Sequence, residues 1–149
     1  MKPIFLTFFI FCYQICSSQK IVDLKLSEWN NSVLLDSVIF ILLDPGQLQK
    51  VNVVVKDSVF YDVLLNKSEV ILYISTNDAK FKTMEGLKVG DTFRTLQKKQ
   101  KIKESDIVLY PGWGRVVRLK DGWSAVFDFS AKITMDSTIM LFYQRSDSL

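Results

Sequence analysis

The sequence predicts an α+β fold in which a largely antiparallel β-sheet carries one short amphipathic helix, at about residues 91–101, packed on it. Three observations lead to this expectation: about six to eight strand-like runs, one stretch with helical spacing, and mostly short connections. The chain has 149 residues, of which 48% are hydrophobic and 23% charged. These values are typical of a globular protein, so we expect a single domain at residues 19–149 after a targeting segment.

The first half of this domain contains a series of strand-like runs. Residues 21–26 alternate between apolar and polar, and residues 50–56 place three valines on one face. The run 37–43 is continuously apolar, which is consistent with a strand buried on both faces. Two further runs, 58–65 and 69–75, are rich in β-branched and aromatic residues. We therefore expect adjacent strands joined by turns over this half.

A hairpin is predicted at residues 115–129, and a last strand at 138–143 with alternate apolar residues on one face. Asp121-Gly122 is a favoured two-residue turn when both residues adopt positive φ. Pairing outward from that turn predicts these opposite pairs: Lys120 with Trp123, Arg118 with Ala125, Val116 with Phe127, and Arg115 with Asp128. Trp123, Ala125 and Phe127 then share one face of the second strand, because side chains alternate along a strand.

The helix is predicted by the spacing of its apolar residues and by the residues at its ends. Asp91 is a good N-cap, and Phe93 and Leu96 lie on one helical face, before a lysine-rich last turn. Gly86 and Gly90 precede it, which also raises the alternative of a phosphate-binding loop. That alternative is disfavoured, since three residues separate the glycines where the loop has four, and an aspartate follows where the loop needs lysine.

The N-terminus reads as a secretory signal peptide at residues 1–18. Lys2 provides a positive start, residues 4–15 are almost wholly apolar, and small residues follow. The alternatives are an uncleaved membrane anchor and lipidation at Cys16. Both cysteines, Cys12 and Cys16, lie in this segment, so we expect no disulfide and no thiol nucleophile in the mature chain. The protein is expected to be exported, and periplasmic or extracellular unless one of these alternatives anchors it to a membrane.

Composition argues against several functional classes. The chain has no histidine, which removes the commonest general base and metal ligand, and no catalytic motif stands out. We expect no cofactor and no metal, and a non-enzymatic role is favoured over an enzymatic one. The net charge of +3 comes from interspersed residues, which argues against a nucleic-acid partner.

The loop at residues 110–115 supplies the candidate binding residues. We expect the turn to present Tyr110 and Trp113 to solvent beside Arg115, with Trp123 and Arg118 nearby on the hairpin. Exposed aromatic rings beside a guanidinium are common on partner and ligand surfaces. The alternative is that Trp113 folds back over the end of the sheet as a lid.

The passage 83–92, with Phe93 and Leu96 after it, resembles the T-x-x-G-[IL]-x-V-G-[SD]-T turn and helix of small uncharacterised secreted or envelope proteins of Gram-negative bacteria. The resemblance covers about residues 70–142. It implies bacterial export and transfers no catalytic residues.

We therefore expect a secreted or periplasmic, non-enzymatic envelope protein that binds a macromolecular partner. The alternatives are a glycan or small-ligand binding module that uses the aromatic loop, and a carboxylate-based glycan hydrolase, which needs two carboxyl groups in one cleft.

Overall fold

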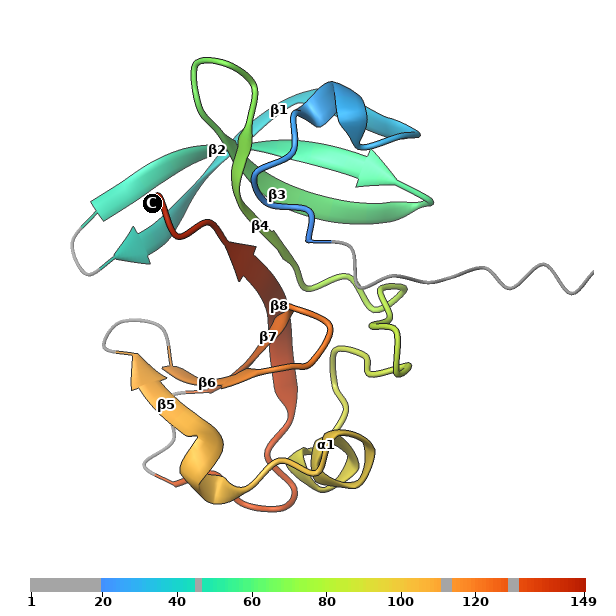
Figure 1. The fold of residues 1–149 in the computed structure, drawn as a ribbon, viewed down its shortest axis with the longest axis vertical. Coiled ribbons are helices and arrows are strands. Elements are labelled where there is room, and N and C mark those ends of the chain that lie inside the picture. The colour runs from blue at the N-terminus through green and yellow to red at the C-terminus, as the bar shows by residue number, and fades with distance from the viewer. Residues whose placement is uncertain (1–19, 45–46, 111–113, 129–131) are drawn as a thin grey trace, which may run out of the picture.

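The computed structural model describes residues 20–44, 47–110, 114–128 and 132–149. It confirms the α+β fold: eight antiparallel strands form one sheet, and the described residues contain one short α-helix (Figure 1). The strands are β1 (Ser32–Asp44), β2 (Gln47–Lys56), β3 (Val59–Leu65), β4 (Ile71–Thr76), β5 (Ile107–Tyr110), β6 (Gly114–Arg118), β7 (Ser124–Phe127) and β8 (Ile139–Arg145). The helix α1 spans Phe93–Gln100, and short 3₁₀ turns occur at Leu26–Glu28 and Glu104–Asp106. No helix in the described ranges is long and apolar enough to cross a membrane.

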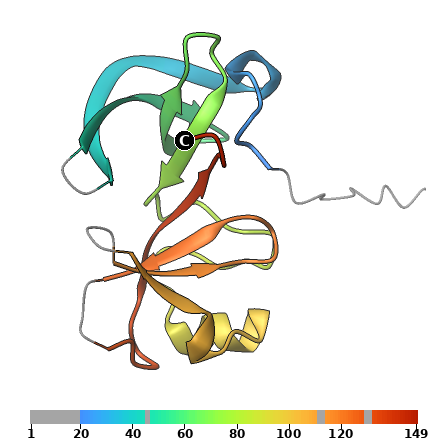
Figure 2. The same cartoon turned by 60° about the vertical axis from the view of Figure 1, so that its left-hand side comes forward.

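The strands lie in the order β1-β2-β3-β4-β8-β7-β6-β5, so the last strand of the chain occupies a central position. β8 pairs with β4 on one side and with β7 on the other. Both views show β8 linking a group formed by β1–β4 to a group formed by β5–β7, with α1 beside the second group (Figures 1 and 2). The two edges of the sheet are β1 and β5.

The hydrophobic core covers one face of the sheet. Phe93 and Leu96 of α1 are buried, as the helical spacing predicts, and the Phe93 ring packs edge-on against Phe127 at 5.8 Å between ring centroids. Phe81 lies at the centre of an aromatic group, 4.8 Å from Trp123 and 5.2 Å from Phe142. This packing ties α1 and the segment before it to β7 and β8.

The helix begins later than the sequence predicts, and Asp91 is not its N-cap. Thr92 is the N-cap, and its side-chain oxygen accepts the backbone N–H of Thr95 at 3.3 Å. Asp91 instead accepts the backbone N–H of Lys88 with its carboxylate at 3.0 Å, and its main-chain oxygen accepts the N–H of Ile139 at 2.9 Å. The main chain of Asp91 is hydrogen-bonded to Ile139 at the start of β8. The helix therefore begins after Thr92.

The hairpin between β6 and β7 exists, but its register differs by one residue from the prediction. The Leu119 N–H donates to the Trp123 carbonyl at 2.7 Å, which leaves a loop of three residues rather than two. Gly122 alone in this loop has positive φ, at 85°, as in a type I turn followed by a bulge. The observed pairs are Arg118 with Ser124, Val117 with Ala125, Val116 with Val126, and Arg115 with Phe127. Trp123, Ala125 and Phe127 are nevertheless all buried, as predicted.

The predicted strand at 21–26 is not formed. A single isolated bridge joins Lys25 to Val70, and the 3₁₀ turn Leu26–Glu28 follows directly. Ile21 and Val22 are both buried despite being adjacent, and the Ile21 N–H donates to the side-chain oxygen of Gln144 at 2.8 Å. The segment therefore runs irregularly beside the start of β4, where the Asp23 N–H donates to the Ile71 carbonyl and the Ile71 N–H donates to the Leu24 carbonyl, each at 2.8 Å.

The run 37–43 does form part of a strand, but it is not buried on both faces. It belongs to β1, the edge of the sheet, and most of its large apolar side chains are exposed. Ile41 is half-buried, and Leu43 is buried. A continuous apolar run leads to burial only when other elements cover both faces, and no described element covers β1 in this way.

Candidate functional site

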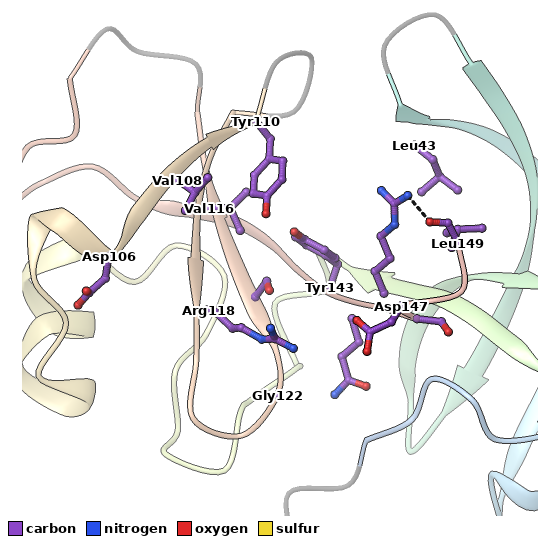
Figure 3. Close-up of a pocket in the computed structure, with 14 residues that line it drawn as sticks. Leu43, Asp106, Val108, Tyr110, Val116, Arg118, Gly122, Tyr143, Asp147 and Leu149 are labelled. Carbon is purple, nitrogen blue, oxygen red and sulfur yellow. Dashed lines mark hydrogen bonds between the residues drawn. The ribbon is translucent and has the colours of Figure 1, made fainter.

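A pocket of about 560 Å³ lies on the face of the sheet opposite the core (Figure 3). One wall comes from β5 and β6, the floor from β7 and β8, and the far wall from the segment after β8 together with the end of β1. The lining residues used below are Leu43, Asp106, Val108, Tyr110, Val116, Arg118, Ser124, Tyr143, Arg145, Asp147 and Leu149. The volume is within the range of small-molecule sites, about 300–1,000 Å³.

Three polar side chains of the pocket are aligned by strand register. Arg118 pairs with Ser124 across β6 and β7, and Ser124 pairs with Tyr143 across β7 and β8. Neighbouring strands are about 4.8 Å apart, so these side chains form one row on the same face. Tyr143 joins this row because a bulge at Met140 changes the alternation of β8: Leu141 pairs with Val126, whereas Ile139 pairs with Phe127. The last strand therefore buries Ile139 on one face and directs Tyr143 to the other, contrary to the shared face predicted for them.

Tyr143 forms part of the pocket floor as a neutral phenol. Burial raises its pKa, while a hydrogen bond from Ser124 and the charges of Arg145 and Arg118 act in the opposite direction. Its ring stacks on Tyr73 at 5.9 Å, with an angle of 25° between the ring planes. Its hydroxyl and that of Tyr110 lie near each other in the close-up (Figure 3). A protonated phenol both donates and accepts hydrogen bonds, which suits a polar ligand group.

Four charged residues line the pocket, and two of them, Arg145 and Asp106, form hydrogen bonds within the protein. The Arg145 guanidinium donates to the main-chain oxygen of Leu149 at 2.7 Å, and Asp106 accepts the backbone N–H of Lys103 at 2.8 Å. Ion pairs join Lys20 to Asp23, Lys56 to Asp57 and Arg94 to Asp136. Neither Arg118 nor Asp147 belongs to any of these, and no hydrogen bond from another described side chain engages either charge.

The structure describes three of the four predicted binding residues and brings one of them to this pocket. Tyr110 lines it and is 49% exposed. Arg115 is half-buried on β6 next to Val116, so its side chain lies on the opposite face of that strand. Trp123 is only 7% exposed and packs in the core. Trp113 lies outside the described residues.

The sequence analysis placed Arg118 near the aromatic loop but did not select Ser124, Tyr143 or Arg145 as binding residues. Alternation along the last strand was a usable signal, because Tyr143 and Arg145 are two residues apart and therefore share a face. The register between distant strands, which places Arg118 and Ser124 beside them, had no signal in local sequence.

Features of a catalytic centre are few in the described part of the chain. No group of three potential metal ligands occurs there. Asp62 is the one described carboxyl group whose pKa is resolved as raised, through burial, and it does not line the pocket. Among these residues, the carboxyl group whose pKa is raised therefore does not lie in the pocket.

A second notable surface is the outer part of the β1–β2 hairpin, on the face of the sheet that carries the core. Its exposed apolar side chains are Leu34, Val38, Phe40, Leu42 and Leu48, and we call this set the hairpin patch. Phe40 and Leu48 are 67% and 68% exposed. Val38, Phe40 and Leu42 alternate along β1, and Leu42 pairs directly with Leu48 on β2. The hairpin patch is therefore an apolar row along β1 that extends to Leu48 on β2, with Lys50 and Asn52 opposite Phe40 and Val38.

A comparison with known proteins found no matching family model, curated protein or solved structure.

Proposed function

We propose that this protein is an exported, non-enzymatic binding protein of the bacterial cell envelope, and that it binds a macromolecular partner with the hairpin patch. The observation that carries the proposal is the exposure of five large apolar side chains on one face of an edge hairpin. Contiguous exposed apolar patches on soluble proteins mark interaction sites more often than isolated exposed residues do.

The strand that carries most of the patch also has an unpaired edge. β1 is 13 residues long, and among the described strands it has a neighbour on one side only. Its outward backbone groups are available to pair with an added strand, while the apolar side chains beside them provide the contact area. The centre of an interface between macromolecules is usually apolar and contains few charged residues.

Export is supported by the N-terminal pattern of Lys2, the apolar run 4–15 and the small residues that follow. The resemblance of residues 83–92 to small envelope proteins is consistent with the same location. A partner in the envelope would cover the hairpin patch, which would otherwise favour aggregation.

The test is crosslinking in intact cells. The full-length protein with a C-terminal tag is expressed in a Gram-negative host, crosslinked, and purified from the envelope fraction. We expect a stoichiometric protein partner with the wild-type chain, and its loss with the double variant Phe40→Ser, Leu48→Ser. Met84→Ser is the matched control, since Met84 is 51% exposed and lies outside the hairpin patch.

Both substitutions in the double variant are at exposed positions, so folding is expected to be retained, as circular dichroism would verify. The absence of a crosslinked partner would contradict the proposal. Equal recovery of the partner with the double variant would show that the hairpin patch is not the interface.

A further inference from the structure

We propose that the pocket binds a zwitterionic ligand, either a free amino acid or a short peptide, with an apolar side chain. In this arrangement Arg118 binds the carboxylate of the ligand, and Asp147 binds its ammonium group. The site lies on the opposite face of the sheet from the hairpin patch, so the inference does not depend on the proposed partner.

The first step in the argument is that two opposite charges line the same pocket without pairing. Arg118 and Asp147 are both exposed, and they approach the pocket from opposite sides (Figure 3). Within the described residues, no ion pair joins them to each other or to another side chain. A guanidinium binds carboxylates with two parallel hydrogen bonds, and a carboxylate accepts hydrogen bonds from an ammonium group.

A neighbouring positive charge, Lys20, already has an ion-pair partner. The Lys20 ammonium contacts the carboxylate of Asp23 at 2.7 Å. Its pKa is raised chiefly by that hydrogen bond, and Asp147 raises it further while Arg118 lowers it. Lys20 is therefore close enough to both pocket charges to interact with them electrostatically, but it makes its ion pair with Asp23. Asp147 remains available to a cationic group of a ligand.

The balance of charge disfavours ligands that carry only one sign. A simple anion attracted by Arg118 would also face Asp147, and a simple cation attracted by Asp147 would face Arg118. Like charges in one site oppose binding, whereas a ligand with both signs satisfies both residues. An α-amino acid or a short peptide is the commonest small molecule that carries a carboxylate and an ammonium group together.

The rest of the pocket fits the uncharged part of such a ligand. Ser124 and Tyr143 lie in the row with Arg118 and offer hydroxyl groups to the ligand's carboxylate or peptide groups. Val108, Tyr110 and Val116 form an apolar and aromatic wall beside them. The volume of about 560 Å³ equals roughly 19 waters at about 30 Å³ each, which is enough for a residue with a large side chain or for a dipeptide.

The experiment uses a set of ligands that differ by one charge. Isothermal titration calorimetry on the purified exported chain compares phenylalanine, 3-phenylpropanoate without the ammonium group, and 2-phenylethylamine without the carboxylate. The dipeptide glycyl-phenylalanine is included to separate a free amino acid from a peptide. We expect a zwitterion to bind at least about tenfold more tightly than either single-charge analogue, which corresponds to about 1.4 kcal/mol.

Two variants assign the two charges. Arg118→Met should weaken phenylalanine and 3-phenylpropanoate about tenfold and leave 2-phenylethylamine unchanged or improved. Asp147→Asn should weaken phenylalanine and 2-phenylethylamine and spare 3-phenylpropanoate. The matched controls are Arg94→Met and Asp136→Asn, which remove the same charges from an exposed pair elsewhere on the surface.

The proposal is overturned if no zwitterion binds, or if 3-phenylpropanoate binds as tightly as phenylalanine. It is also overturned if the control variants weaken binding as much as the pocket variants do. Tighter binding of glycyl-phenylalanine than of phenylalanine would identify a peptide as the ligand, and the reverse order would identify an amino acid. Urea unfolding of each variant verifies that a lost signal reflects the pocket and not the fold.

Discussion

Gly114 provides a sharp test of the sheet geometry, because β6 begins there with a φ of 112° that side chains rarely adopt. A methyl group added to Gly114 would lie 2.4 Å from the main-chain oxygen of Phe127 on the neighbouring strand. Phe127 is fully buried against Phe93 of α1, so β7 is poorly placed to move away. Gly114→Ala should therefore incur both backbone strain and a steric clash.

The two contributions have different sizes. Backbone strain at positive φ costs about 1–2 kcal/mol, and relief of overpacking typically costs about 1–3 kcal/mol. We expect Gly114→Ala to lower the free energy of unfolding by about 2–5 kcal/mol, which urea unfolding followed by circular dichroism would measure.

Gly90→Ala is the control that separates strain from clash. Gly90 has a φ of 88°, and an added methyl group meets nothing within 4 Å. This variant should lose about 1–2 kcal/mol only. If Gly114→Ala is no more destabilising than Gly90→Ala, β6 and β7 do not approach each other closely at Gly114.

Two further predictions concern a carboxyl group and a helix cap. Burial raises the pKa of Asp62 in the folded protein above its ordinary 3.8. Between pH 3.8 and the folded-state pKa, the folded protein therefore binds more protons than the unfolded chain, and its stability falls as pH rises through the folded-state pKa. Asp62→Asn should therefore raise the urea midpoint more at pH 7 than at pH 3, relative to wild type; an equal shift at both pH values would refute the assignment. Thr92→Ala should cost about 1 kcal/mol through loss of the N-cap, measured by urea unfolding, and an unchanged midpoint would exclude Thr92 as the cap.

Local patterns predicted α1 and the hairpin well in outline. Phe93 and Leu96 are three residues apart and lie on the buried face of the helix, as spacing alone requires. The errors there are small: the cap moved by one residue, and the turn contains three residues instead of two. The helix cap is changed by a contact with another element, and the turn by a contact within the turn itself. Residue type alone does not reveal either contact. Asp91 is held by β8, and the Asp121 carboxylate accepts the N–H of Trp123 at 3.3 Å.

The candidate site was predicted less well. Tyr110 was placed correctly at the surface, but Trp123 is a core residue, and Arg118 and Tyr143 meet only through β7. Arg118 and Tyr143 are 25 residues apart in the sequence. No short-range pattern indicates that two such positions will share a row.

The sequence by itself predicted α1, every described strand except β5, the buried face of α1, and which side chains of the β7 strand point inward, although it also predicted a strand at 21–26 that does not form. Each of these depends on spacing and residue type within a few positions. Only the tertiary structure decided that β8 lies between β4 and β7, that the run 37–43 forms an exposed edge, and that Arg118 and Asp147 line one pocket. The physical reason is that burial and proximity depend on which elements pack together, and strand order is set by contacts between residues far apart in the chain.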